Sequence, residues 1–290
     1  MKHHSEVSFL NDPAAADSRG SFRLDQRLDN LIRRVHLRFL VRWFVAVKSC
    51  ILMILRKDRR VFHATHFLIA TEGNAFEFSL LAFRATLAGQ ELLRRRPNLW
   101  ETLGDRSTLQ ACPGDSVGRW YIEHMRSFDL DERYYLSVVR DLAEQLENDA
   151  ERAWLRTRID SAHDLRHVVT GYRTDDWGEF CLQSFRFGQT RHVGSLILSL
   201  FGLLSVRFRR RGAVLRSWQE AYRRGRDAKL LDLVLWENAF DQPLSTVRAA
   251  LGLHPVKHYP SPVAPNAYID CSRATHCDAP PKAITLGAAV

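Results

Sequence analysis

Apolar residues recur three or four positions apart along most of this chain, and this helical periodicity constrains its fold more than any other feature. The stretch ERYYLSVVRDLAEQLE, residues 132–147, shows the pattern clearly, because its apolar side chains form one stripe along a helix. Asp131, directly before it, is a favourable N-cap residue. Alternating patterns typical of strands are scarce. The sequence therefore predicts an all-α protein built as a single multi-helix domain.

The same periodicity sets the expected boundaries of the helices and of the domain. Helices are expected at residues 26–56, 58–72, 74–95, 116–127, 132–148, 150–169, 175–206, 213–224, 227–239 and 243–252. We expect a flexible arm over 1–25, an all-helical domain over 26–254 and an irregular tail over 255–290, because neither end carries a periodic apolar stripe. The five cysteines contain no CxxC pair, so a cysteine zinc site is not expected.

The first expected helix is basic and amphipathic. Arg34, Arg38 and Arg42 fall on one stripe of it, and the opposite face is apolar, with Phe44 and Ile51. This pattern is typical of a helix in the headgroup region of an anionic membrane, although a core helix with snorkelling arginines shows it too. Nucleic acid is not an expected partner, because no docking motif occurs and the aromatic residues do not lie between the arginines.

A second segment joins apolar and basic residues. Residues 194–206 carry no charge, and Arg207, Arg209, Arg210 and Arg211 follow. The run is too short to span a bilayer as a helix. A helix that is apolar nearly all round is buried, faces lipid or lines an apolar cavity, and core packing is the favoured interpretation.

The stretch SAHDLRHVVTGYRTDDWGEF gathers residue types that bind metal ions. His163 and His167 are four apart, so their imidazoles leave one face of a helix about a turn apart. Asp164 is adjacent and is able to bind the same ion or to orient a ligand. Gly171 ends this helix, and a tight turn brings Glu179 of the next helix back toward His163. Such nitrogen and oxygen ligands suit zinc, with iron and manganese as alternatives.

Other interpretations of the histidine pair remain open at this point. The chain has twelve histidines, so a pair four apart also arises by chance as ordinary core residues. A zincin-type protease is disfavoured, since HExxH places a glutamate beside the first histidine, where this chain has the shorter Asp164. An HD-type phosphohydrolase needs a further His and Asp in the same pocket, for which His124 and Asp232 are the candidates.

The sequence around these residues resembles the coenzyme Q biosynthesis family known as COQ-four. HDLRHVVTGYRTDDWGE is similar to the HDxxH-x11-E signature of that family, with residues 168–178 as the spacer. LRKDRRVFHATHFL and ELLRRRPNL resemble the upstream helices of the family, and CPGDSVGRWYIEHM resembles the segment before the signature. SWQEAYRRGRDAKLLDLVLWENAFDQPLSTVRAALGL resembles its closing segment. In this order the similar segments cover residues 55–254.

This resemblance implies an all-helical peripheral membrane protein that binds zinc through four residues: His163, Asp164, His167 and Glu179. It implies oxidative decarboxylation of a polyprenylated hydroxybenzoate, in which a hydroxyl replaces the C1 carboxyl, but it assigns no catalytic residue. The implied partners are an isoprenoid lipid, an anionic membrane surface, other quinone-biosynthesis enzymes and a second copy in a homodimer. The implied location is the cytoplasmic face of a bacterial inner membrane, or the matrix side of the mitochondrial inner membrane in a eukaryote.

Two departures from the family pattern keep alternatives open. Arg166 occupies a position inside the signature where an apolar or aromatic residue is expected, and the basic first helix and the tail are longer than the family core. These features are compatible with a paralogue that serves another prenyl-lipid pathway. A non-catalytic scaffold that binds prenyl lipid is the other alternative, because structural zinc sites have four protein ligands.

Overall fold

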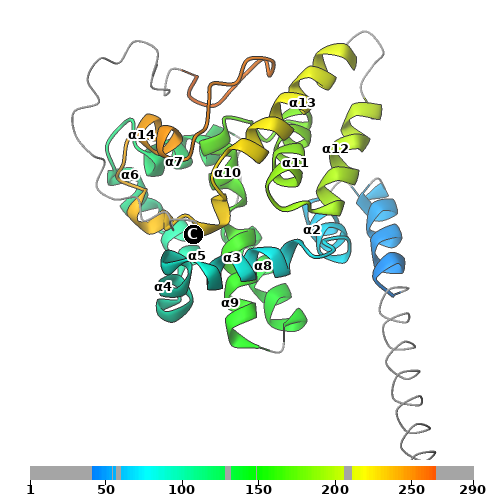
Figure 1. The fold of residues 1–290 in the computed structure, drawn as a ribbon, viewed down its shortest axis with the longest axis horizontal. Helices are drawn as coiled ribbons and strands as arrows, with labels where there is room; N and C mark the ends of the chain where they lie inside the picture. The colour runs from blue at the N-terminus through cyan, green and yellow to red at the C-terminus, as the bar shows by residue number, and fades with distance from the viewer. Residues whose placement is uncertain are drawn as a thin grey trace, which may run out of the picture. The chain divides into compact units, whose positions relative to one another are not determined.

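The computed structural model describes residues 41–53, 55–56, 60–127, 132–147, 149–205 and 211–265. These residues form helices, turns and coil, without a β-strand (Figure 1). An isolated antiparallel bridge joins Ser116 and Pro243. The predicted all-α class is therefore confirmed. The chain divides into a unit over Met1–Ala70 and a unit over Thr71–Val290, and each is described by itself.

Some expectations concern residues outside this description. They are the arm over 1–25, Arg34 and Arg38 of the basic stripe, the N-cap candidate Asp131, three of the arginines after the uncharged run (Arg207, Arg209 and Arg210), and residues 266–290 of the tail. The described part of the tail, residues 255–265, contains no helix, but its Tyr259 is buried in the core of the second unit.

The first unit contains a helix over residues 41–53 and α2 (Arg60–Ala70). The side chain of Arg42 joins them, because its Nε donates to the carbonyl oxygen of Ala70 and its Nη2 to that of Ile69, both at 3.2 Å. The last carbonyls of a helix lack partners within it, so Arg42 caps α2. Large apolar side chains of the first helix are exposed: Val41, Trp43, Phe44, Val47 and Ile51.

The second unit is a bundle of short helices. They are α3 (Ala75–Ala85), α4 (Leu87–Arg95), α5 (Leu99–Gly104), α6 (Arg106–Ala111), α7 (Val117–Ser127), α8 (Glu132–Leu146), α9 (Ala150–Ser161), α10 (His163–Thr170), α11 (Asp176–Thr190), α12 (Val193–Ser205), α13 (Arg211–Asp227) and α14 (Leu244–Ala250). The largest hydrophobic core surrounds α10, whose Leu165 and Val168 are completely buried with Tyr121 of α7 and Leu182 of α11. α11 also packs against α12 and α13.

The helix expected over 175–206 is two helices in the structure. Arg191 ends α11 in a left-handed conformation with φ of 57°. His192 follows, and its Nδ1 accepts a hydrogen bond from the backbone N–H of Ser195 at 3.1 Å. The imidazole therefore caps α12, a role usually filled by a short polar side chain that sequence patterns identify more readily.

The helix expected over 227–239 is absent, and two short 3-10 turns, Leu231–Leu233 and Trp236–Asn238, take its place in the described chain. The backbone N–H of Lys229 donates to the carbonyl oxygen of Leu251 at 3.0 Å. Tertiary partners of this kind satisfy the backbone without a helix, so the apolar spacing of this segment was misleading.

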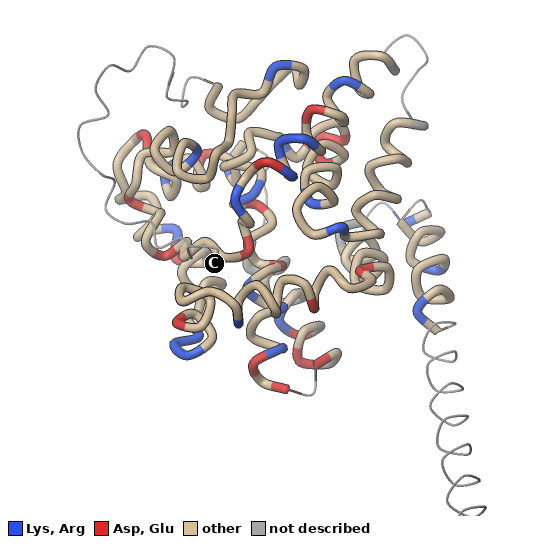
Figure 2. The backbone as a smooth tube through the Cα atoms, in the orientation of Figure 1, with Lys and Arg blue, Asp and Glu red and all other residues tan. Residues whose placement is uncertain are grey.

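α12 has one buried face and one exposed face. Gly202 lies against the ring of Phe180, where a Cβ atom would come within 1.9 Å of the ring carbons. Ser195 Oγ donates to Gln183 Oε1 at 2.8 Å on the same side. Figure 2 shows no charged residue along α12. Its opposite face exposes three large apolar side chains: Val193, Leu200 and Phe201. Core packing therefore accounts for one face of this helix only.

Among the residues that the structure describes, no helix combines the length and the apolar character that crossing a bilayer requires.

Candidate metal centre

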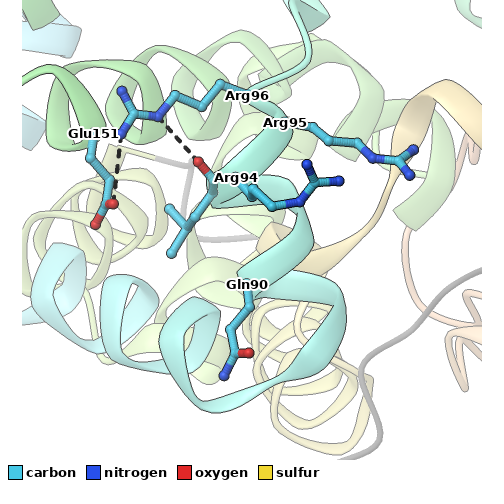
Figure 3. Close-up of a pocket in the computed structure, with 6 residues that line it drawn as sticks. Gln90, Arg94, Arg95, Arg96 and Glu151 are labelled. Carbon is cyan, nitrogen blue, oxygen red and sulfur yellow. Dashed lines mark hydrogen bonds and ion pairs between the residues drawn. The ribbon is translucent and has the colours of Figure 1, made fainter.

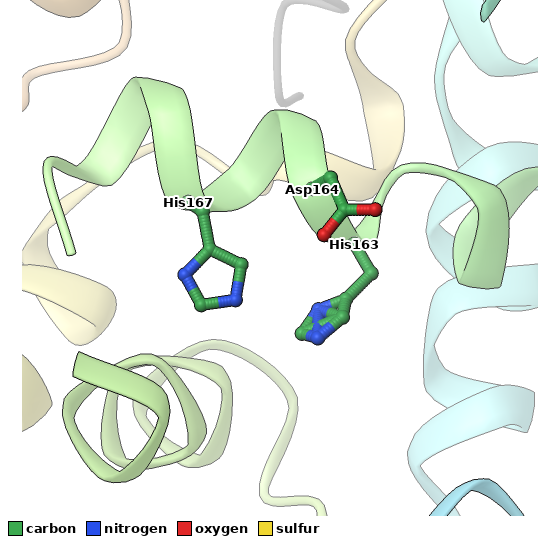
Figure 4. A group of neighbouring side chains, drawn as sticks. All are labelled: His163, Asp164 and His167. Carbon is green, nitrogen blue, oxygen red and sulfur yellow. The ribbon is translucent and has the colours of Figure 1, made fainter. Parts of the chain in front are cut away.

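α10 carries three of the four predicted site residues. The helix expected over 150–169 is interrupted at Ala162, which ends α9 and precedes α10. His163 and Asp164 therefore lie in the first turn of α10, and His167 lies one turn later on the same side as His163 (Figure 4). The spacing expected from the sequence is present.

The turn between α10 and α11 brings Glu179 toward these residues. Gly171 ends α10 with φ of 88°, a left-handed conformation that glycine adopts without strain. Asp175 caps α11 by accepting a hydrogen bond from the N–H of Gly178 at 2.9 Å. A Cβ atom on Gly178 would lie 2.1 Å from the carbonyl oxygen of Arg173. The glycine therefore permits a tight turn, after which Glu179 lies in the first turn of α11.

The four predicted residues meet at the junction of these two helices. One donor atom each of His163, Asp164 and His167 lies within 4.8 Å of the others. Across the junction, Glu179 Oε1 lies 3.1 Å from His167 Nε2, and Glu179 Oε2 lies 3.8 Å from His163 Nε2. The structure thus brings together all four side chains on which the sequence-based hypothesis depends.

The orientation of His167 is set by a hydrogen bond on its far side. His167 Nδ1 donates to the carbonyl oxygen of Tyr172 at 2.9 Å. Because a carbonyl only accepts, Nδ1 carries a proton, and Nε2 is the ring nitrogen that faces Glu179. A backbone carbonyl commonly fixes a metal-binding histidine in this way.

Burial and the neighbouring charges set the protonation states of the cluster. Burial and the adjacent His167 lower the pKa of His163 to about 3, so this ring is neutral at neutral pH. Burial raises the pKa of Glu179, but the attraction of His167 and His163 outweighs it and brings the pKa to about 2. Burial lowers the pKa of His167, but the Glu179 carboxylate outweighs it, and the net pKa is raised. The Glu179 carboxylate therefore favours the protonated form of His167.

The dimensions and the chemistry of the donor set fit a divalent ion. Zinc ligands lie about 2.0–2.2 Å from the ion, so two donors of a tetrahedral site are roughly 3.3 Å apart. The two distances from Glu179 to the histidines, 3.1 and 3.8 Å, lie on either side of that value. The His167 side chain is 0% exposed, whereas those of His163 and Glu179 are 25% and 34% exposed. His163 and Glu179 therefore lie on the side of the cluster that is partly exposed to solvent.

The two candidates for an HD-type arrangement have different surroundings. The ring centroid of His124 on α7 lies 5.6 Å from that of His167. Asp232 instead accepts hydrogen bonds from Arg166 Nη2 at 2.7 Å and from Ser79 Oγ at 2.6 Å. Asp232 therefore neutralises a buried arginine, and this pairing gives a structural reason for Arg166 within the signature.

Sequence analysis did not identify Arg248, which holds the end of α10 in place. Its completely buried guanidinium donates to the carbonyl oxygens of Val168 and Val169 at 2.8 and 2.9 Å. It also donates to those of Val263 and Ala264, each at 2.8 Å. A cation at a helix C-terminus is favourable, but no local pattern links an arginine to carbonyls about 80 residues earlier in the chain.

A surface pocket at the end of α4 contains none of the predicted site residues (Figure 3). It is lined by Gln90, Leu93, Arg94, Arg95, Arg96 and Glu151. Arg94 pairs with Glu91 at 2.6 Å, and Arg96 pairs with Glu151 at 3.7 Å. Acidic neighbours thus compensate this basic surface, and we assign it no function.

The fold and the cluster define an all-helical protein with two histidines and two carboxylates at the junction of two consecutive helices. The protein family described as "Coenzyme Q (ubiquinone) biosynthesis protein Coq4" matches residues 32–257, which is most of the chain. The chain therefore belongs to the Coq4 family of ubiquinone biosynthesis proteins. The matched range contains the whole region in which the sequence resembles this family.

Individual relatives agree with this assignment. The chain is 28% identical over 187 residues to "Ubiquinone biosynthesis protein COQ4 homolog, mitochondrial" of Drosophila ananassae, covering 63% of this chain and 67% of the relative. It is 29% identical over 226 residues to "Ubiquinone biosynthesis protein coq4, mitochondrial" of Aspergillus flavus, covering 76% and 75%. The crystal structure of a putative ubiquinone biosynthesis protein from Nostoc punctiforme PCC 73102 has a TM-score of 0.55 at 18% identity, covering 73% of this chain and 97% of that one. At this identity the likeness concerns the fold alone.

Proposed function

We propose that this chain is a metal-dependent enzyme that acts on the head group of a polyprenylated hydroxybenzoate in ubiquinone biosynthesis. The proposed reaction is oxidative decarboxylation at C1, which leaves a hydroxyl in place of the carboxyl. The observation that supports it most is the convergence of four side chains in a chain of this family: His163, Asp164, His167 and Glu179. Zinc is the proposed ion, with iron and manganese as alternatives.

The proposed reaction needs an oxidant. The bond between the ring and the carboxyl carbon breaks and carbon dioxide leaves, while a new bond forms between the same ring carbon and oxygen. This exchange oxidises the ring carbon by two electrons. Dioxygen is the oxidant: one of its atoms enters the ring as the new hydroxyl and the other is reduced to water. The two electrons and two protons for that water come from oxidation of the hydroquinone product to the quinone, so the proposed enzyme is an oxygen-consuming one.

The residues of the cluster suit this chemistry. A bound divalent ion supplies Lewis-acid stabilisation of negative charge on a substrate oxygen. The Tyr172 carbonyl holds His167 so that its Nε2 faces the cluster. His163 is neutral at neutral pH and adds no positive charge of its own. The partial exposure of His163 and Glu179 leaves the head group an approach on that side.

We also propose that the protein works at the periphery of a membrane, where a polyprenylated substrate is dissolved. Exposed apolar side chains on the helix over 41–53 and on α12 support this attachment. The sequence places basic residues close to both segments, and these favour anionic headgroups. The proposed location is the cytoplasmic face of a bacterial inner membrane, or the matrix side of the mitochondrial inner membrane, in line with the mitochondrial relatives.

A scaffold with a structural zinc is the second candidate function. The observation that favours it is the presence of four protein donors, since catalytic zinc sites usually keep one position for water or substrate. In both proposals the chain binds an isoprenoid lipid, contacts other quinone-biosynthesis enzymes and forms a homodimer. The two proposals differ in turnover, which is directly measurable.

The test uses purified full-length protein, metal-free or loaded with zinc, iron or manganese. Each form is incubated in air with vesicles that contain a prenylated 4-hydroxy-3-methoxybenzoate, and mass spectrometry follows the product and the incorporation of labelled dioxygen. Glu179→Gln removes one donor, and Glu144→Gln at an exposed position of α8 is the matched control.

We expect decarboxylated, hydroxylated product from one metal-loaded form of the wild type and of Glu144→Gln, and none from Glu179→Gln. Metal-loaded protein that converts no substrate but retains the prenyl lipid would support the scaffold. Conversion of a different prenylated aromatic acid would indicate a paralogue of another prenyl-lipid pathway.

A further inference from the structure

α7 places a further imidazole beside His167 of α10. His124 is 3% exposed and lies on the buried face of α7 with Tyr121 and Met125. Its ring centroid lies 5.6 Å from that of His167, and the two ring planes differ by 22°. The ring centroids of His163 and His167 are 4.8 Å apart. His167 thus has two imidazole neighbours, His163 on its own helix and His124 on α7.

These separations fit imidazoles that share one ion. An imidazole nitrogen binds zinc at about 2.0–2.1 Å, so the centre of its ring lies roughly 3.2 Å from the ion. Two such rings at a tetrahedral angle have centres roughly 5.2 Å apart. The separation of 4.8 Å between His163 and His167 and that of 5.6 Å between His124 and His167 lie on either side of this value.

His124 also lies within the electrostatic reach of Glu179. Burial and the neighbouring His167 lower the pKa of His124 to about 3, and the Glu179 carboxylate opposes this shift. Conversely, His124 is one of the groups that hold the pKa of Glu179 low against the effect of burial. His124 and Glu179 thus lie close enough for each to influence the other.

We propose that His124 is a further ligand of the metal ion, in addition to the four donors that α10 and α11 supply. This inference rests on the proposed metal site and adds a ligand from a third helix. Imidazole nitrogens suit zinc and iron, whereas manganese prefers oxygen, so the added nitrogen shifts the selectivity toward zinc and iron. Because the ion then joins α7 to α10 and α11, its binding also stabilises the packing of these helices.

The test measures metal binding by the full chain without substrate. Metal-free wild type, His124→Phe and His124→Gln are titrated with zinc and with manganese against a chromophoric chelator, and with cobalt to record its visible absorption. Phenylalanine keeps an aromatic ring beside His167 but lacks a nitrogen. His254→Gln, at an exposed position, is the matched control. Circular dichroism and thermal melting of the metal-free proteins report whether each variant is folded.

We expect each folded His124 variant to bind zinc at least about 100-fold more weakly than the wild type, since losing an outer hydrogen-bond partner of a ligand already costs 10–100-fold. The preference for zinc over manganese should fall, and the cobalt spectrum should change. His254→Gln should match the wild type.

A folded His124→Phe that binds zinc within about threefold of the wild type, with an unchanged cobalt spectrum, would show that His124 only packs against the site. If His124→Phe does not fold, the same criterion applies to His124→Gln. A wild-type protein that binds none of these metals would instead overturn the proposed metal site itself, so the two failures are distinguishable.

Discussion

Two regions of the molecule depart from the usual distribution of residues, in opposite ways. The junction of α10 and α11 buries polar side chains, whereas the exposed face of α12 presents apolar side chains to solvent. At the junction, histidines and carboxylates are buried or half-buried, with His167 completely inaccessible. On α12, Leu200 and Phe201 are exposed although they are large and apolar. Buried polar groups and exposed apolar surfaces both cost stability unless a partner compensates them. We propose partners of different chemistry for the two regions, an ion for the junction and a lipid for the face, so changes at one region should leave the other unaffected.

The largest expected effect concerns Arg248, whose hydrogen bonds hold the end of α10 at the junction. Arg248→Met should lower the free energy of unfolding by about 3 kcal/mol or more, because it removes four hydrogen bonds from a buried guanidinium and leaves their carbonyl oxygens unsatisfied. Arg216→Met, at an exposed position of α13, should change it by less than about 0.5 kcal/mol. Urea denaturation measures both variants. A loss below about 1 kcal/mol in Arg248→Met would show that the end of α10 is held by other contacts.

The next effect concerns the ion at the junction. Free zinc at 100 times its dissociation constant should stabilise the wild type by about 2.7 kcal/mol, and a chelator should reverse the gain. His167→Ala should show no such stabilisation, whereas His258→Ala, at an exposed position, should behave like the wild type. Thermal melting with and without zinc measures the difference. Equal stabilisation of wild type and His167→Ala would place any bound zinc elsewhere.

A smaller effect is expected at the face of α12. The double substitution of Leu200 and Phe201 by Ser should weaken partition into anionic vesicles about tenfold, because both side chains are already exposed in the free protein. Stability and zinc binding should be preserved. Phe78→Ser on α3 removes an equally exposed aromatic residue and serves as the control. If sedimentation with vesicles gives the same weakening for both, the α12 face has no special role in membrane binding.

The smallest effect concerns the turn that presents Glu179. Asp175→Ala should cost about 1 kcal/mol, because Asp175 caps α11 through Gly178 and also accepts a hydrogen bond from Tyr259. Asp175→Asn should cost less, since asparagine is an equally good capping residue. Zinc affinity should also be lower in Asp175→Ala than in Asp175→Asn. If Asp175→Ala is destabilised but binds zinc with unchanged affinity, the cap stabilises α11 without being needed to position Glu179.

Local sequence patterns were sufficient to predict the all-α class and to predict which residues gather at the junction of α10 and α11. His163 and His167 share a helix face because helical geometry fixes their spacing, and Gly171 marks the reversal that returns the chain to Glu179. Both features depend on residues close in sequence. This explains why the arrangement of the cluster was predictable while its chemical role stays a prediction.

Features set by distant contacts were not predictable in the same way. The caps that Arg248 and His192 provide depend on tertiary packing, as does the pairing of Arg166 with Asp232. The approach of His124 to His167 depends on how α7 packs against α10. A single sequence carries no periodic signal for such contacts. It could nominate His124 only as a candidate for an HD-type arrangement, and the contact with His167 became visible once the helices were placed together.

The most direct test of the central claim is metal analysis of the purified full-length protein combined with X-ray absorption at the edge of the metal found. We expect a single bound ion with nitrogen and oxygen ligands at about 2.0–2.2 Å, and we expect it to be lost in His167→Ala. A wild-type protein that binds neither zinc, iron nor manganese, or an ion that remains unchanged in His167→Ala, would contradict it.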